Sequence, residues 1–185
     1  MWTEHHVEHI ETALEEAGAL TGPERVPAMV FLDLVGYTRL TEERGDEAAA
    51  ELAGVLGSVV DRSSRHHGGI PVKWLGDGVM HHFRDAFGAV ASALEMVEEV
   101  PKRGLPHAHV GVAAGPMVAY GGAYFGRTVN LASRIAGRAG MGQVLVSERV
   151  AESVAPNGLR FTELGEVDLK GFASPVKLFE ARRRE

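Results

Sequence analysis

Two aspartates stand in segments that could hold them for metal binding. Asp33 closes an apolar run that begins at Ala28, and Asp77 lies between two glycines in the segment from Lys73 to Met80. A third segment, residues 128–134, places the amide of Asn130 and the guanidinium group of Arg134 four residues apart. Hard cations such as Mg²⁺ prefer carboxylate oxygens, and triphosphates prefer arginine and lysine. The set therefore indicates two-metal phosphoryl chemistry on a nucleotide.

The residues around the two aspartates support a metal-binding role for them. Asp33 ends a predicted buried strand, and Gly36 after it would let the backbone approach phosphate oxygens, with Thr38 or Glu42 opening the next helix. Taken singly, Asp33 could be a strand-end residue that caps a helix, and Asp77 could be an ordinary hairpin turn residue. Their occurrence together with Lys73 and the third segment favours a metal site.

Asn130 and Arg134 share one face of a predicted helix, because residues four apart in a helix lie one turn apart. An amide can fix a ribose oxygen, and an arginine can brace the charge that develops on a phosphate. Taken alone, this pair is equally compatible with an exposed arginine and a first-turn asparagine that have no role. Lys73 and Lys170 could likewise be surface charges.

The elements that must position these residues alternate between strand and helix. The patterns predict strands at 28–35, 70–74, 79–83, 107–114 and 144–146, then two or three strands around a turn at Gly171. They predict helices at 46–67, from Asp85 to about 100, from Thr128 to about 140, and after Ser147, with Asp85, Thr128 and Ser147 as N-caps. This order fits an α+β fold with helices over a mixed sheet.

The composition limits the classes of protein to which this chain can belong. The 185 residues suffice for one domain with a core, and 45% are hydrophobic and 24% charged. A formal charge of -6 argues against a general nucleic-acid binder, which would carry a basic face. The chain has no cysteine, so a cytoplasmic location is expected, and no apolar stretch is long enough to span a membrane.

The three segments, in this order and spacing, resemble the class III nucleotidyl cyclases. The resemblance runs from about Val26 to about Ala181, and Gly68-Gly69 and the segment 164–171 also fit it. It implies the ferredoxin-like, palm-type fold of that family, with a mixed β-sheet flanked by helices. It also divides the chain into an N-terminal helix or linker, 1–22, and a catalytic domain, 23–185.

The resemblance also implies a reaction, in which the 3′-hydroxyl of ATP attacks its own α-phosphate, releasing pyrophosphate and forming 3′,5′-cyclic AMP. Two divalent cations, Mg²⁺ or Mn²⁺, would be held by Asp33, Asp77 and Leu34. Asn130 would position the ribose, and Arg134 would stabilise the transition state. The other residues expected to bind substrate are Gly36, Tyr37, Thr38, Lys73, Ala123 and Lys170.

In this family the site forms between two chains, and this chain carries both halves, so the resemblance implies a head-to-tail homodimer. Lys73 matches the family's adenine-reading lysine. The second base-reading position, seven before the helix asparagine, is Ala123, which cannot accept a hydrogen bond from the adenine amino group. ATP is therefore expected as substrate, with poor discrimination against GTP.

Two alternatives remain beside an adenylyl cyclase. One is a weakly active or GTP-accepting cyclase, and the other is a cyclase-like module that binds nucleotide and dimerises to regulate a partner. A diguanylate cyclase is excluded because its Gly-Gly-Asp/Glu-Glu-Phe turn is missing. Residues 3–20 are predicted as an amphipathic helix, which the resemblance makes a linker from a regulatory domain. Its His5, His6 and His9 most simply form a solvated face.

Overall fold

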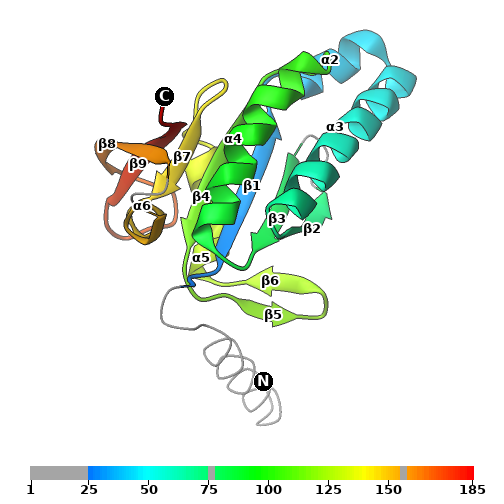
Figure 1. The fold of residues 1–185 in the computed structure, drawn as a ribbon. Helices are drawn as coiled ribbons and strands as arrows, with labels where there is room; N and C mark the ends of the chain where they lie inside the picture. Colours follow the sequence, from blue (N-terminus) through cyan, green and yellow to red (C-terminus); the bar gives the residue numbers. More distant parts are fainter. Residues whose placement is uncertain (1–24, 75–77, 155–157) are drawn as a thin grey trace.

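A seven-stranded mixed sheet forms the centre of the protein in the computed structural model, which describes residues 25–74, 78–154 and 158–185 (Figure 1). Its strands are β1 (Ala28–Leu34), β2 (Gly69–Trp74), β3 (Gly78–Phe83), β4 (Ala108–Ala114), β7 (Val144–Ser147), β8 (Leu159–Val167) and β9 (Val176–Arg183). The strand order is β2-β3-β1-β4-β7-β9-β8. Only the β4–β7 pair of this sheet is parallel. The predicted N-terminal helix, its three histidines and Asp77 lie outside the described residues.

Helices cover both faces of the sheet. They are α2 (Tyr37–Arg44), α3 (Asp46–His66), α4 (Ala86–Lys102), α5 (Arg127–Ala136) and α6 (Glu148–Val154). Figure 1 shows α3 and α4 side by side over one face. A separate hairpin, β5 (Val118–Tyr120) with β6 (Ala123–Phe125), leads into α5. The predicted α+β class with a mixed sheet flanked by helices is confirmed.

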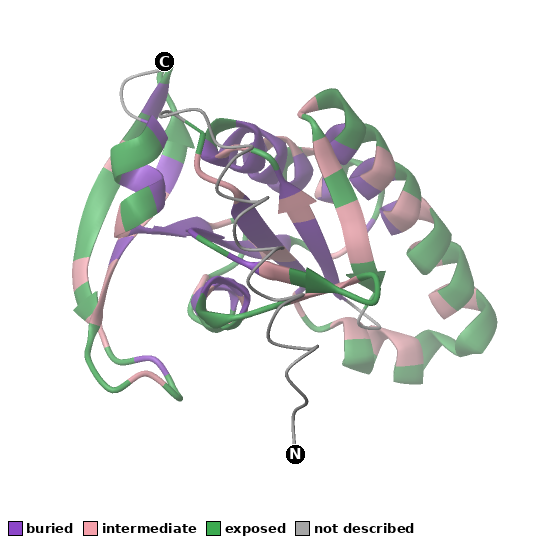
Figure 2. Ribbon diagram, turned by 90° about the horizontal axis from the view of Figure 1, so that it is seen from below, coloured by how far each residue is buried: buried purple, intermediate pink, exposed green. Residues whose placement is uncertain are grey.

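The core has two parts, one on each face of the sheet. On one face, alternate residues of β1 such as Val30 and Leu32 pack with Val60 of α3 and Val90 of α4. On the other face, Met29 packs with residues of α5. In Figure 2 the buried residues lie along the central strands and on the helix surfaces turned toward them. A strand covered on both faces loses the polar alternation of a half-exposed strand, which explains the continuous apolar run of β1.

Of the three predicted side-chain caps, one is right and two are wrong, although α6 does begin directly after Ser147 as predicted. Asp85 caps α4, because its carboxylate accepts a hydrogen bond from the Gly88 N–H at 2.8 Å. Thr128 does not cap α5: the N-cap is Gly126, and the Thr128 hydroxyl instead donates to the Pro116 carbonyl. α5 ends at Ala136, four residues before the predicted end near Gly140. The buried Ser147 hydroxyl makes no hydrogen bond and therefore caps nothing.

β2 forms one free edge of the sheet and is irregular. Its pairing with β3 shifts register between Pro71 and Lys73, and Ile70 and Trp74 are exposed. At its start, a Cβ on Gly69 would lie 2.3 Å from the ring of Phe83. The glycine therefore lets the phenylalanine ring lie flat against the strand backbone.

Candidate active site

Asp33 lies near the carboxyl end of β1, which is one of the inner strands of the sheet. Its side chain is 44% exposed, although the strand around it is largely buried. One carboxylate oxygen accepts a hydrogen bond from the N–H of the next residue, Leu34, at 3.1 Å. The carboxylate is thus held by a central strand and is partly exposed to solvent.

The strand register brings the second aspartate segment to the first. Asp33 of β1 pairs with Gly78, the first residue of β3. A Cβ on Gly78 would lie 2.9 Å from the Leu32 carbonyl oxygen and 3.3 Å from a carboxylate oxygen of Asp33. A side chain at position 78 would therefore crowd Asp33, so the glycine keeps this place open. Asp77 itself lies outside the described residues, but it is bonded directly to Gly78.

His109 is a third residue at this place, and the sequence analysis missed it. It pairs with Asp33 across β1 and β4, and its Nε2 lies 3.5 Å from the other carboxylate oxygen of Asp33. Its Nδ1 lies 2.7 Å from the carbonyl oxygen of Ala136 at the end of α5. A carbonyl only accepts hydrogen bonds, so Nδ1 carries a proton, and Nε2 is the nitrogen turned toward Asp33.

The chain after Asp33 makes a tight turn into α2. Gly36 is the N-cap, with φ at 69°, and no side chain caps the helix. The first N–H groups of α2 are therefore left without a side-chain acceptor, which suits an anion. The side chain of Tyr37 reaches α3, where its hydroxyl donates to the Ala49 carbonyl at 3.1 Å. Thr38 is exposed, and its carbonyl accepts a hydrogen bond from the Thr41 hydroxyl.

Asn130 and Arg134 lie on the outer face of α5, and both are exposed. Val129, Ala132 and Ile135 on the inner face pack against the sheet. The backbone of α5 comes very close to β4, because a Cβ on Gly111 would lie 2.2 Å from the nitrogen of Ala136. The predicted sharing of one helix face by the amide and the guanidinium group is confirmed.

Lys170 lies in the turn after β8, which is anchored near α5. Leu169 and Phe172 of this turn pack in the same part of the core as the inner face of α5. The guanidinium group of Arg127, in the first turn of α5, lies 4.7 Å from the centre of the Phe172 ring. The Arg127–Phe172 contact ties the Lys170 turn to the helix that carries Asn130 and Arg134.

The predicted base-reading residues lie on neighbouring strands. Lys73 of β2 is exposed, Ala123 of β6 is half-buried, and β2 contacts β6. The neighbour of Ala123, Tyr124, stacks on the ring of His82 of β3, with the ring centres 4.4 Å apart. Burial and the nearby Arg84 lower the pKa of His82. This stack fixes the β5–β6 hairpin against the sheet.

His81 faces the opposite side of β3 and is fully buried. Burial lowers the pKa of His81 from its ordinary value to about 3. Its Nδ1 lies 2.7 Å from the Ser64 hydroxyl of α3, while Nε2 is buried with no hydrogen-bond partner. The imidazole is therefore neutral and structural.

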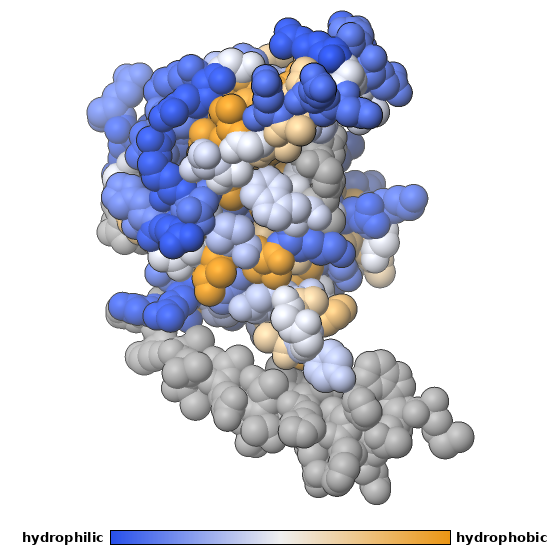
Figure 3. All heavy atoms as spheres, turned by 90° about the vertical axis from the view of Figure 1, so that its right-hand side faces the viewer, coloured by the Kyte–Doolittle hydropathy of each residue, from blue (hydrophilic) through white to orange (hydrophobic). Residues whose placement is uncertain are grey.

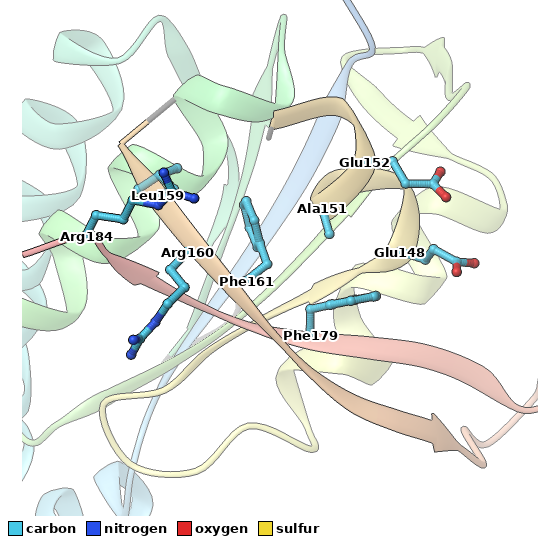
Figure 4. Close-up of a pocket in the computed structure, with 8 residues that line it drawn as sticks. All are labelled: Glu148, Ala151, Glu152, Leu159, Arg160, Phe161, Phe179 and Arg184. Atoms are coloured by element: carbon cyan, nitrogen blue, oxygen red, sulfur yellow. The ribbon is translucent and has the colours of Figure 1, made fainter. Parts of the chain in front are cut away.

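A separate hollow of about 350 Å³ lies between α6 and the strands β8 and β9. Figure 4 shows the rings of Phe161 and Phe179 in it, with Glu148 and Glu152 directed away on α6. None of the predicted site residues lines this hollow. The predicted site residues lie instead in separate places: at the ends of β1 and β3 with the start of α2, and on the outer face of α5.

The sequence of the chain matches those of known cyclases. The family model for the adenylate and guanylate cyclase catalytic domain matches residues 23–180. A pH-sensitive adenylate cyclase of Mycobacterium tuberculosis, MT1302, is 34% identical over 94% of this chain and 46% of its own length. An adenylate cyclase of Streptomyces coelicolor is 38% identical over 69% of this chain and 34% of its own length.

The crystal structure of the adenylyl cyclase CyaB from P. aeruginosa shares the fold, with a TM-score of 0.78 at 23% identity, over 87% of this chain and 95% of that one. The chain therefore belongs to the class III adenylyl and guanylyl cyclase catalytic domain family. It spans less than half the length of the two curated relatives. Among the described residues, no helix has the length and apolar character needed to cross a membrane.

Proposed function

We propose that this chain is an adenylyl cyclase domain that converts ATP to 3′,5′-cyclic AMP and pyrophosphate in a homodimer. The observation that carries the proposal is the pairing of Asp33 with Gly78, which joins the two aspartate segments at one end of the sheet. Asn130 and Arg134 on the open face of α5 supply groups that suit a ribose and a phosphate. Residues 23–185 would form this domain, and residues 1–22 a linker.

The donor groups fit a divalent cation of the Mg²⁺ or Mn²⁺ type. Asp33 offers a half-exposed carboxylate oxygen, and the glycine opposite it leaves room beside that oxygen. Asp77 would bring a second carboxylate, and the backbone carbonyl of Leu34 a neutral oxygen. Asp33 and Asp77 would hold two such cations, which would lower the pKa of the attacking hydroxyl and neutralise triphosphate charge. His109 would keep the Asp33 carboxylate oriented.

The chain's own residues would bind and orient the nucleotide. The N–H groups at the start of α2 behind Gly36, including the backbone N–H groups of Tyr37 and Thr38, would donate hydrogen bonds to phosphate oxygens. Asn130 would hold the ribose so that its 3′-oxygen lies in line with the α-phosphate. Arg134 would brace the charge on the phosphate as the bond to pyrophosphate breaks, and Lys170 would contact the triphosphate.

A head-to-tail dimer is proposed because each chain carries both halves of the site. Ile70 and Trp74 on β2, and Tyr120 and Phe125 on the hairpin, are large apolar side chains that are 47% to 61% exposed. Figure 3 looks onto the side of β2 and α3 and shows hydrophobic groups gathered between hydrophilic ones. Covering such side chains with a second copy would remove apolar surface from water.

Mixing two inactive variants tests the shared site. D33N damages the metal half and R134A the opposite half, so each homodimer should be inactive. If the chains exchange freely, about half of the dimers in an equal mixture are mixed, and each mixed dimer has one intact site of two. The mixture should therefore recover about one quarter of the wild-type rate of cyclic AMP formation.

The matched control mixes D33N with D77N, both in the metal half. No site in that mixture is intact, so activity should not return. If the D33N and R134A mixture stays as inactive as this control while the wild type is active, the site is not shared between chains. If the wild type forms no cyclic nucleotide from ATP or GTP with either cation at any protein concentration, the proposed function is wrong.

Ala123 favours a second candidate, a cyclase that also accepts GTP. The half-buried methyl group of Ala123 makes no hydrogen bond to a base, so Lys73 alone would discriminate between adenine and guanine. Chromatography of the products from equimolar ATP and GTP separates the two candidates. Cyclic AMP as the main product supports the adenylyl cyclase, and comparable cyclic AMP and cyclic GMP supports the non-selective enzyme.

A further inference from the structure

A cluster of metal-ligating side chains lies away from the candidate active site, where the end of α3 meets α4. Nε2 of His67 is 2.7 Å from a carboxylate oxygen of Glu95, and Nδ1 of His66 is 3.6 Å from the same oxygen. Each residue offers one ligand atom, and these atoms lie within 4.8 Å of one another. This is the one such group of three among the residues that the structure describes.

We propose that His66, His67 and Glu95 bind a single Zn²⁺ ion, with water as the fourth ligand. Zinc takes two imidazole nitrogens and one carboxylate oxygen at about 2.0–2.2 Å, which places neighbouring ligand atoms about 3.3 Å apart in a tetrahedron. The separation of 3.6 Å between His66 and Glu95 is close to that value. The separation of 2.7 Å between His67 and Glu95 is a hydrogen bond, which needs to open by about 0.6 Å.

The backbone around the cluster is fixed by close packing. A Cβ on Gly88 would lie 2.4 Å from the His67 carbonyl oxygen, so the end of α3 rests directly on the first turn of α4. Ser63 and Ser92 join the same two helices by a buried hydrogen bond at 3.0 Å. The ligands therefore stand on two helices whose relative position is set before any ion binds.

The burial of the three side chains also suits an ion that keeps one water. His67 and Glu95 are 19% and 21% exposed, and His66 is 72% exposed. Two ligands are thus held inside the helix contact, and the third, His66, lies at the exposed side, where water can reach the ion. The imidazole pair selects zinc over Mg²⁺, which prefers oxygen ligands.

The test is a zinc titration of the full chain, read by calorimetry and by thermal unfolding. Three other histidines at the N-terminus, His5, His6 and His9, are first replaced by glutamine so that they cannot bind the ion. Millimolar Mg²⁺ is present throughout to compete with zinc for the carboxylate of Asp33. The expected result is one Zn²⁺ per chain and an unfolding temperature that rises with zinc and returns with a chelator.

Single ligand variants decide the outcome. H67Q and E95Q should each weaken zinc binding by at least roughly tenfold, because even groups behind the ligands of a metal site matter that much. H107Q, which changes an exposed histidine elsewhere, should bind zinc like its parent. Comparing each protein with and without zinc removes any effect of the lost His67–Glu95 hydrogen bond on stability.

Two results would overturn the proposal. One is the absence of stoichiometric zinc binding in the parent protein. The other is equal zinc affinity in the parent, H67Q and E95Q. Cobalt offers a second readout, since its visible absorption becomes intense in a tetrahedral site. That absorption should disappear in H67Q and remain in H107Q. Neither readout depends on cyclase activity, so the zinc proposal is tested independently of the proposed reaction.

Discussion

Acid should destabilise this domain through one buried histidine. Burial lowers the pKa of His81 to about 3 in the folded protein, while the unfolded chain has the ordinary value of 6.5. The unfolded state therefore binds one more proton between these two values, and stability falls as the pH drops below about 6.5. Above that pH both states hold a neutral imidazole, and the effect vanishes.

The size of the effect follows from the two pKa values. At pH 5 the unfolded state gains about 2 kcal/mol from protonation of this imidazole, and the folded state gains almost nothing. At pH 7.5 the difference is below about 0.1 kcal/mol. A loss of about 2 kcal/mol corresponds to roughly 4–8 °C in melting temperature for a domain of this size.

Urea unfolding of the wild type and H81Q at pH 7.5 and pH 5 measures this contribution. H81Q is expected to be less stable at pH 7.5, since Gln cannot fill the same space beside Ser64. Its further loss on moving to pH 5 should be about 2 kcal/mol smaller than that of the wild type. H107Q, at an exposed site, should behave like the wild type.

Equal pH dependence in the wild type and H81Q would refute this reasoning. It would mean that the buried imidazole accepts a proton without unfolding, for instance through water that reaches Nε2. H81L provides a second comparison should H81Q fail to fold, because leucine also lacks a titrating group. The same difference of about 2 kcal/mol is expected for it.

Three further predictions concern the candidate site. A123T should raise the preference for ATP over GTP about fivefold, because its hydroxyl adds one hydrogen bond worth about 1 kcal/mol. The ratio of cyclic AMP to cyclic GMP measures this preference, and A123V, which has the same shape without the hydroxyl, is the matched control. H109L should raise the Mn²⁺ concentration for half-maximal activity roughly tenfold by freeing Asp33, whereas H107L should not. G111A should lower the free energy of unfolding by about 1–3 kcal/mol and slow turnover, because the added methyl group pushes α5 away from β4. G54A, at a position on α3 with open space around it, should neither lower the stability nor slow turnover. Thermal melting and the rate of product formation measure the two effects.

Local sequence patterns predicted the elements of the sheet well. β1 is a continuous apolar run, and a glycine-rich segment separates β2 from β3 in the sequence, so these strands were predicted within a residue of their bounds. The sequence also indicated Asp33 as a strand-end carboxylate. Asn130 and Arg134 needed only the helical repeat to be placed on one face.

Contacts between distant segments could not be predicted in this way. His109 reaches Asp33 only because the register of β4 on β1 places the two residues opposite each other. The close approach of α5 to Gly111 also depends on that packing. The cap of α5 was predicted wrongly because the Thr128 hydroxyl has an acceptor, the Pro116 carbonyl, that lies outside its own helix. The family resemblance supplied roles for residues that local patterns leave open.

The irregular edge of the sheet limits how a second molecule can attach there. An exposed edge strand normally invites another strand to extend the sheet through backbone hydrogen bonds. Pro71 has no N–H to offer, and the register shift beside it bends the row of remaining donors and acceptors. A molecule that covers Ile70 and Trp74 must therefore do so with its side chains. Such a contact can separate and re-form without breaking a ladder of backbone bonds, and the same irregularity protects the free chain against strand-to-strand aggregation.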